Sequence, residues 1–200
     1  MGFCEASMPT IILLRHGETH WNRQQRIQGH GDSPLTLKGI DQARAYGRAV
    51  APLLGAAQWR LVSSPLSRCM QTMAIFCEVA GLDFAQVERD ARLKEVSTGE
   101  YSGRLKAEFP PGELGGSGRQ SWFFHCPGGE SHDHMVARLS AWLESLSEND
   151  HVIAVSHGIA GKVLRGLYCG WDPDSALAQD SPQDALFLLR DGQMQRLACP

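Results

Sequence analysis

Two short stretches of the sequence each end an apolar run with a histidine and a glycine. The first, IILLRHGE, places Arg15 and His16 directly after four apolar residues. The second, VIAVSHG, places His157 at the matching point of another apolar run. A neutral imidazole can act as a nucleophile, and a neighbouring guanidinium can hold an anionic group. These histidines are therefore packed core residues, metal ligands, or two parts of one reactive site.

The elements that must position these residues alternate between strand and helix patterns. Apolar runs predict strands at Thr10–Leu14, Trp59–Ser64 and His151–Val155, a weaker strand at Phe84–Val87, and an edge hairpin near the C-terminus that turns at Asp191-Gly192. Helical spacing and capping residues predict helices after Thr36, from Ser64 (N-cap) to Gly81, over Glu130–Leu146 and over Ile159–Tyr168, with a short one at Arg104–Phe109. This alternation predicts an α/β fold, a three-layer α/β/α sandwich around a mainly parallel sheet.

The predicted fold brings several cationic residues to one place. Ligands bind outside the carboxyl ends of the strands in open α/β sheets, and His16 and His157 both follow such ends. Arg68 falls in the first turn of a predicted helix after the next strand, on the same side of the sheet. Arg15, Arg68, two histidines and a helix N-terminus would form a cationic hole suited to a dianionic phosphoryl group.

Composition limits the kinds of partner. The chain has 200 residues, 19 Lys+Arg and 22 Asp+Glu, with a formal net charge of −3, which gives no electrostatic basis for binding nucleic acid. We expect no membrane span and no secretory signal, because no apolar run is long enough and the first residues lack a basic region. The six cysteines form no C-x-x-C pair, so we interpret them as reduced core residues of a cytoplasmic protein. The sequence leaves the oligomeric state open.

We expect a single domain over residues 1–200. Residues 1–9 are interpreted as a flexible leader, and residues 99–129 as an insertion that caps the active site. No repeat and no linker divides the chain.

At this point the residues resemble a known family. The stretches RHGETHWN, SSPLSRCMQT, RLKEVSTGEYSG and VSHG are similar to those of the histidine phosphatases, the phosphoglycerate-mutase-like superfamily, in order and spacing over nearly the whole chain. The small bacterial-type phosphatases are the branch that the chain resembles most.

The resemblance implies a role for each matching residue. His16 would attack phosphorus and carry a phosphohistidine, and Glu95 would protonate the leaving oxygen and then activate water. Arg15, Arg68 and His157 would hold the phosphoryl oxygens. Asn22 would add a phosphate contact, and Gln28 and Gly29 would line the pocket. Nearby arginines favour the neutral form of the nucleophilic imidazole, and they replace the positive charge of a metal ion. We therefore expect no metal and no cofactor, and a small phosphorylated molecule as the partner.

Other residues that invite a functional interpretation have a simpler one. His132 and His134 lie two positions apart on a predicted helix and point to different faces, which favours surface roles over a metal site. The aromatic residues Trp122, Phe123 and Phe124 either cap the pocket or form a small core of the insertion, and we favour the core.

Three functions remain to be separated. The first is a metal-independent phosphatase acting on small monoesters. The second is a cofactor-dependent phosphoglycerate mutase, which is weakened here because the insertion offers only Arg119 near RQSWFFHC and Ile159 follows the second His-Gly. The third is a non-catalytic phosphate-binding regulator, which we expect to have lost His16 or Glu95. The sequence does not identify the substrate.

Overall fold

A single mixed β-sheet organises residues 8–199, the part of the chain that the computed structural model describes. Its strand order is β3-β2-β4-β1-β5-β6. Strands β1 to β4 are parallel to one another. Strand β5 is antiparallel to β1, and β6 is antiparallel to β5, with which it forms the edge hairpin. The strands are β1 (Thr10–Arg15), β2 (Trp59–Ser63), β3 (Glu88–Arg89), β4 (His151–Ser156), β5 (Ala185–Arg190) and β6 (Gln193–Ala198). The predicted mainly parallel sheet is confirmed.

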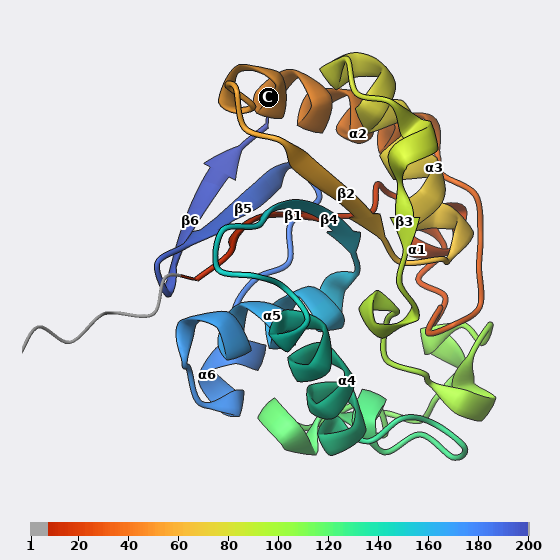
Figure 1. Cartoon of the computed structure of the whole chain (residues 1–200). Helices are drawn as coiled ribbons and strands as arrows, with labels where there is room; N and C mark the ends of the chain where they lie inside the picture. Colours follow the sequence, from red (N-terminus) through yellow and green to blue (C-terminus); the bar gives the residue numbers. More distant parts are fainter. Residues whose placement is uncertain (1–7, 200) are drawn as a thin grey trace, which may run out of the picture.

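Helices cover both faces of this sheet (Figure 1). Alternate residues of β1 show the two layers, because Ile12 and Leu14 pack with α2 and α3 whereas Ile11 and Leu13 pack with α4 and α5. The predicted α/β/α arrangement is therefore confirmed. The helices are α1 (His20–Arg23), α2 (Leu37–Val50), α3 (Ser67–Ala80), α4 (His132–Glu144), α5 (Gly158–Cys169) and α6 (Pro173–Ala178).

Helix α3 begins later than its sequence predicts. The N-cap is Leu66, not Ser64, and it makes no side-chain capping bond. The carboxylate of Asp32, from a distant loop, accepts the backbone N–H groups of Ser67 and Arg68 instead. Because a residue far away in sequence supplies the cap, the local pair Ser64-Pro65 wrongly indicated an earlier start of the helix.

The strand predicted at Phe84–Val87 is also displaced. Residues Phe84–Gln86 form a 3₁₀ turn, η2, whose first turn is capped by the Asp83 side chain. The strand itself, β3, has two residues, Glu88–Arg89, and pairs with the end of β2. The Asx-type cap at Asp83 outcompetes an extended conformation in this short segment.

Residues 99–129 contain single 3₁₀ turns in place of longer elements. The predicted helix at Arg104–Phe109 is reduced to one such turn, η5 (Lys106–Glu108). The other turns in this segment are η4 (Gly99–Tyr101), η6 (Gly118–Gln120) and η7 (Trp122–Phe124), and elsewhere in the chain η1 (Ala51–Leu53) and η3 (Ala91–Leu93).

The start of the chain divides into two parts. Residues 1–7 of the expected leader lie outside the described residues. Met8 packs against the core, and the carbonyl of Pro9 accepts a hydrogen bond from the Tyr168 hydroxyl at 2.7 Å. The cysteines of the described part are free, and no helix in that part is long and apolar enough to cross a membrane.

Candidate active site

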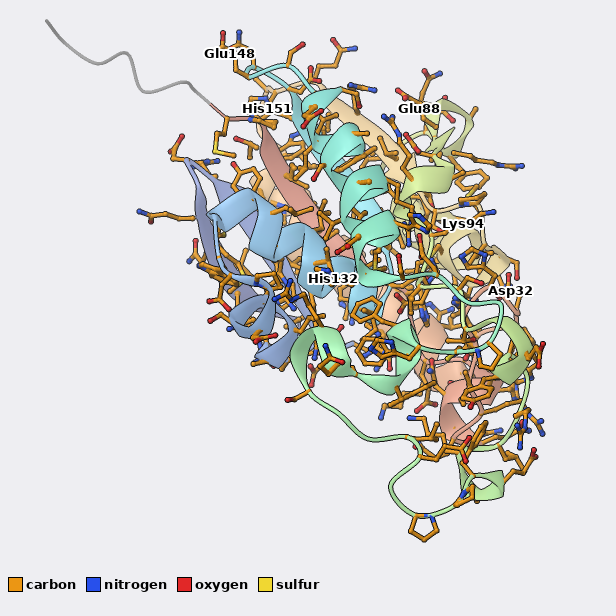
Figure 2. The ribbon with its side chains drawn as sticks, turned by 90° about the horizontal axis from the view of Figure 1, so that it is seen from below. Asp32, Glu88, Lys94, His132, Glu148 and His151 are labelled. Carbon is orange, nitrogen blue, oxygen red and sulfur yellow. The ribbon has the colours of Figure 1, made fainter. Side chains whose placement is uncertain are left out.

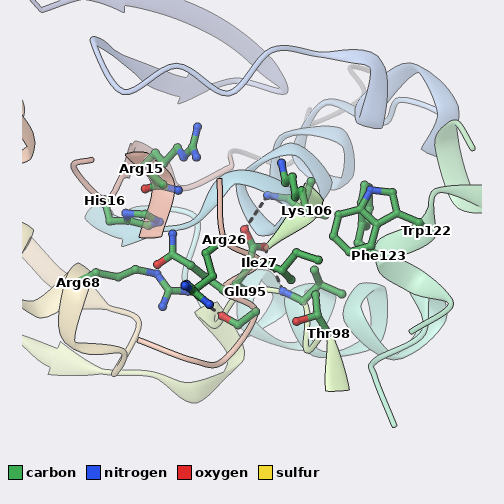
Figure 3. Close-up of a pocket in the computed structure, with 15 residues that line it drawn as sticks. Arg15, His16, Arg26, Ile27, Arg68, Glu95, Thr98, Lys106, Trp122 and Phe123 are labelled. Atoms are coloured by element: carbon green, nitrogen blue, oxygen red, sulfur yellow. Dashed lines mark hydrogen bonds between the residues drawn. The ribbon is translucent and has the colours of Figure 1, made fainter. Parts of the chain in front are cut away.

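A cavity of about 280 Å³ opens beyond the carboxyl ends of β1 and β4. It is the place where parts of the chain far apart in sequence meet (Figure 3). Seven of the residues singled out from the sequence line it: Arg15, His16, Asn22, Gln28, Gly29, Arg68 and Glu95. His157, the eighth, is 1% exposed and lies behind the wall, with its ring centroid 5.3 Å from that of His16.

His16 is held as a neutral imidazole. Its Nδ1 lies 2.8 Å from the carbonyl oxygen of Gly17, so Nδ1 carries the proton and Nε2 keeps its lone pair. Burial, followed by the positive charges of Arg68 and Arg15, lowers the pKa of His16 well below its usual value. This is the protonation state and tautomer that a nucleophile requires.

Gly17 allows a close approach between the turn that carries His16 and the start of α2. A Cβ atom there would collide with the backbone carbonyl of Gly39, and a Cβ at Gly39 would collide with the carbonyl of Glu18. The turn after β1 and the first turn of α2 therefore touch backbone to backbone. The two glycines fix the depth at which His16 enters the cavity.

Arg68 is buried and almost fully hydrogen-bonded. Its Nη2 donates to the carbonyl of Gly29 at 2.8 Å, and its Nη1 donates to the carbonyl of Gly31 at 2.7 Å and to Asp32 Oδ1 at 3.2 Å. Its Nε lies 3.2 Å from Nδ1 of His157. Of five N–H donors, one on Nη2 has no partner among residues 8–199 and is available to a ligand.

Asp32 is the group that orients Arg68. Burial alone would raise the pKa of Asp32, but hydrogen bonds from Ser67 and the charge of Arg68 lower it. The carboxylate therefore stays ionised and binds both the guanidinium and the backbone at the start of α3. Asp32 lies in the stretch DSPLT, which belongs to none of the motifs that indicate the site in the sequence.

His157 supports the site from behind. Its Nε2 lies 2.8 Å from the Ser64 hydroxyl, so both ring nitrogens have protein partners. Burial, followed by Arg68, lowers the pKa of His157 well below its usual value. Cys69 lies 3.4 Å from the same Nε2, but burial raises the pKa of its thiol to about 12, which excludes it as a competing thiolate.

Arg15 is tied to a loop near the C-terminus. Its Nη1 donates to the carbonyl of Ser181, while its buried Nε has no hydrogen-bond partner among the described residues. In the same loop, Gln183 donates from Nε2 to the carbonyl of His16 at 2.9 Å. An unpartnered guanidinium nitrogen in a cavity wall is a natural donor to an anionic ligand.

Asn22 lines the cavity and also stabilises the start of helix α1. Its Oδ1 accepts from the backbone N–H of Thr19 at 3.1 Å, completing a capping box at the start of α1. This bond fixes the amide orientation and leaves Nδ2 as the group that can face a ligand.

Glu95 faces the N-terminus of helix α5. Its Oε1 accepts the backbone N–H groups of Val96 at 3.0 Å and Ala160 at 2.9 Å, and its Oε2 accepts that of Ile159 at 3.1 Å. Oε2 therefore has a single protein donor. The sequence matched Glu95 to a family pattern but did not show that this helix end would hold it.

Two further polar side chains in the wall lack partners. Gln28 Oε1 and Thr98 Oγ1 are buried and have no hydrogen bond within residues 8–199. Gly29 has a φ of +50° and lies so close to Thr98 that a Cβ would strike its hydroxyl. These orphaned atoms face a cavity and are typical of a polar ligand site.

The aromatic residues Trp122, Phe123 and Phe124 do not all have the same role, cavity wall or core. Trp122 and Phe123 line the cavity on the side away from Arg15, His16 and Arg68 (Figure 3), whereas Phe124 is buried in the core. We favoured the core for this stretch, which is confirmed for Phe124, whereas Phe123 packs against the core and also lines the cavity, and Trp122 lines the cavity alone.

The cavity also contains two cations that sequence reasoning missed, Arg26 and Lys106. Lysines and arginines of loops carry no periodic pattern, and neither residue belongs to a motif singled out from the sequence. His132 and His134 lie elsewhere, at the first turn of α4, and Glu148 and His151 lie past the other end of that helix (Figure 2). His132 packs edge-on against Phe124, which gives it a structural role.

Two sequence comparisons with known proteins identify the same family. The sequence profile of the histidine phosphatase superfamily (branch 1) matches residues 11–189. "Probable phosphoglycerate mutase GpmB" of Salmonella paratyphi C is 37% identical over 161 residues, covering 76% of this chain and 71% of that protein.

Solved structures show the same fold. A mycobacterial glucosyl-3-phosphoglycerate phosphatase in complex with VO3 superposes with a TM-score of 0.72 at 23% identity, covering 94% of this chain and 96% of the other. Phosphoglycerate mutase from Bacillus anthracis str. Sterne superposes with a TM-score of 0.70 at 19% identity, covering 97% and 93%.

Proposed function

Because the chain belongs to branch 1 of the histidine phosphatase superfamily, we propose that it hydrolyses small phosphate monoesters through a phosphohistidine on His16. The observation that carries the proposal is the state of His16, a neutral imidazole whose Nδ1 is tied to Gly17 while two arginines lie beside it. A core histidine has no need of two guanidinium groups beside it, whereas an in-line attack on a phosphoryl dianion does.

The first step transfers the phosphoryl group to the protein. Nε2 of His16 attacks phosphorus, the ester P–O bond breaks, and Glu95 gives its proton to the departing oxygen. The Nε and the free Nη2 proton of the two arginines, Arg15 and Arg68, hold the oxygens that carry developing charge. These fixed cations supply the charge stabilisation, so the proposed reaction needs no metal ion.

The second step returns the site to its starting state. Glu95 takes a proton from water, the resulting hydroxide attacks phosphorus, and the P–N bond to His16 breaks to release inorganic phosphate. Ser64 and Arg68 hold His157 behind the nucleophile, where its neutral ring supports the guanidinium of Arg68. For His157 to bind the phosphoryl group directly, its ring has to give up its hydrogen bond to Ser64 or to Arg68.

A phosphoglycerate mutase is the second candidate, favoured by the name of the Salmonella relative. The mutase alternative is weakened because its stretch of the insertion offers a single cation, Arg119, and that residue is exposed and does not line the cavity. Supplying 3-phosphoglycerate with a trace of bisphosphoglycerate separates the two, since a mutase isomerises it rapidly without net release of phosphate.

The proposal is tested by replacing the nucleophile. We expect His16→Asn to lower kcat/KM for an aryl phosphate by on the order of a thousandfold or more, and His134→Asn, an exposed histidine outside the cavity, to leave it unchanged. Brief incubation with labelled substrate followed by denaturation should give an acid-labile phosphoprotein that the variant does not form. Full activity of His16→Asn would refute the assignment.

A further inference from the structure

Glu95, the proposed acid and base, comes from a segment without regular structure. Residues 94–98, which follow the 3₁₀ turn η3 (Ala91–Leu93), belong to no helix or strand. The regular backbone hydrogen bonds of a helix or sheet therefore do not fix this part of the chain. Two charged side chains from a later part of the chain, Glu130 and Arg138, bind its backbone groups instead.

Arg138, on helix α4, binds the backbone before and at Glu95. Its Nη1 donates to the carbonyls of Arg92 at 2.5 Å and Lys94 at 2.8 Å. Its Nη2 donates to the carbonyl of Glu95 at 3.3 Å, and the same carbonyl accepts a hydrogen bond from Nε2 of His30 at 2.8 Å. One guanidinium thus holds three carbonyl groups of the segment that carries the carboxylate.

Glu130 orients Arg138 and binds the backbone after Glu95. Its Oε1 accepts from Nε of Arg138 at 2.6 Å and its Oε2 accepts from Nη2 at 2.8 Å, which makes a bidentate ion pair. The backbone N–H of Glu130 donates to the carbonyl of Ser97 at 2.8 Å, and Oε2 accepts the N–H of Ser97 at 3.4 Å. The ion pair therefore holds the chain on both sides of Glu95.

The two side chains act at a distance from the cavity. They are 18% and 14% exposed, for Arg138 and Glu130 respectively, and neither lines the cavity, whereas Glu95 does (Figure 3). Neither can therefore touch a substrate there. An exposed ion pair would contribute little, but this one is largely buried and bound to the backbone, so its geometry is fixed.

We infer that Arg138 and Glu130 are positioning residues for Glu95, which hold its carboxylate where it can give a proton to the leaving oxygen. The inference rests on the proposed function. The carboxylate is bound by helix α5 through the N–H groups of Ile159 and Ala160, and the backbone behind it is bound by the ion pair. Both are required, since a misplacement of about 1 Å can slow a reaction by about a hundredfold.

Two esters of similar shape test whether the ion pair acts through Glu95. The leaving oxygen of phenyl phosphate benefits from a proton, whereas 2,4-dinitrophenolate departs readily without one. Arg138→Gln should lower kcat/KM for phenyl phosphate by about tenfold or more, and for 2,4-dinitrophenyl phosphate by less than about threefold. The ratio kcat/KM is the correct measure because it reports only the steps up to departure of the phenol, whereas kcat includes the second step.

Further variants assign this selectivity to the pair. Glu95→Gln should show it more strongly, because the acid itself is lost, and Glu130→Gln should resemble Arg138→Gln. The double variant Glu130→Gln/Arg138→Gln leaves no buried charge unpaired and serves if a single variant does not fold. Arg60→Gln, which removes an arginine that pairs with two carboxylates outside the cavity, should leave the selectivity unchanged. Equal losses for both esters in the Arg138 and Glu130 variants would overturn the inference.

Amide hydrogen exchange separates this inference from the proposed function, because it requires no turnover. The N–H groups of Ile159 and Ala160 donate to Glu95 and should exchange about threefold faster or more in Arg138→Gln than in the wild type. Faster exchange in a protein that releases no phosphate would refute hydrolysis and retain the positioning of Glu95. Unchanged exchange with equal losses for both esters would retain hydrolysis and refute the positioning.

Discussion

At the scale of single residues, the site depends on two imidazole rings that stay neutral. Burial and Arg68 lower the pKa of both His16 and His157 well below the usual value of 6.5. The unfolded chain therefore binds protons before the folded chain as the pH falls. The contribution of the neutral rings to stability is complete above about pH 6.5 and is lost progressively below it.

This linkage can be measured. We expect the free energy of unfolding in urea to fall as the pH is lowered from 7.5 to 5.5, mostly below pH 6.5, with each histidine contributing at most about 1.4 kcal/mol per pH unit. His16→Asn should make the dependence shallower by one such contribution. Identical slopes for the variant and the wild type would show that His16 titrates alike in the folded and unfolded chain.

At the scale of elements, the close approach of the turn after β1 and the start of α2 sets the position of His16. Gly39→Ala places a methyl group against the Glu18 carbonyl. Because that carbonyl belongs to the backbone, it cannot easily move away. We expect a loss of about 1–3 kcal/mol in stability and a lower kcat for an aryl phosphate, measured by thermal unfolding and steady-state kinetics.

Gly161→Ala is the matched control in another helix, α5. A Cβ there meets only Leu13 Cδ2, at 3.9 Å. The substitution should raise stability by up to about 1 kcal/mol through helix propensity. If both variants behaved alike, backbone contact at Gly39 would not be what positions the turn.

Elements with long apolar runs could be predicted from the sequence, and short ones could not. Strands β1, β2 and β4 and helices α4 and α5 follow their patterns within two residues, and α2 begins directly after Thr36 as predicted. The four-residue α1 has no periodicity to detect, whereas α6 had an unused signal, the Asp172 cap followed by Pro173.

The same distinction applies to the candidate site. Residues in matched motifs, such as His16 and Arg68, were found in advance and meet at the cavity. Asp32 and Gln183 act through contacts 36 and 167 positions away in sequence. Tertiary packing alone brings such groups to the site, so local patterns could not identify them.

At the scale of the whole molecule, the C-terminal third of the chain holds both ends of β1. The Tyr168 hydroxyl donates to the Pro9 carbonyl before the strand, and Gln183 donates to the His16 carbonyl after it. The two hydrogen bonds have similar lengths, 2.7 and 2.9 Å, but only the second lies at the cavity.

These two bonds should therefore have different consequences when broken. We expect Tyr168→Phe to lower the free energy of unfolding by about 1 kcal/mol without changing kcat. Gln183→Leu should cost a similar amount of stability, on the order of 1 kcal/mol, and also lower kcat/KM. Urea titrations and kinetics on both variants check this, and a kinetic defect in Tyr168→Phe would contradict it.

The register of β1 also has a consequence for biosynthesis. Thr10 pairs with His151 and Leu13 with Phe187, so β1 leaves the ribosome well before either of its partner strands, β4 and β5. The apolar run Ile11–Leu14 therefore stays exposed while the intervening segments are synthesised, and strand pairing over such a long sequence separation forms slowly. We therefore expect the nascent chain to be prone to association until β4 and β5 are translated, and a prematurely terminated product to carry His16 without the residues that hold it.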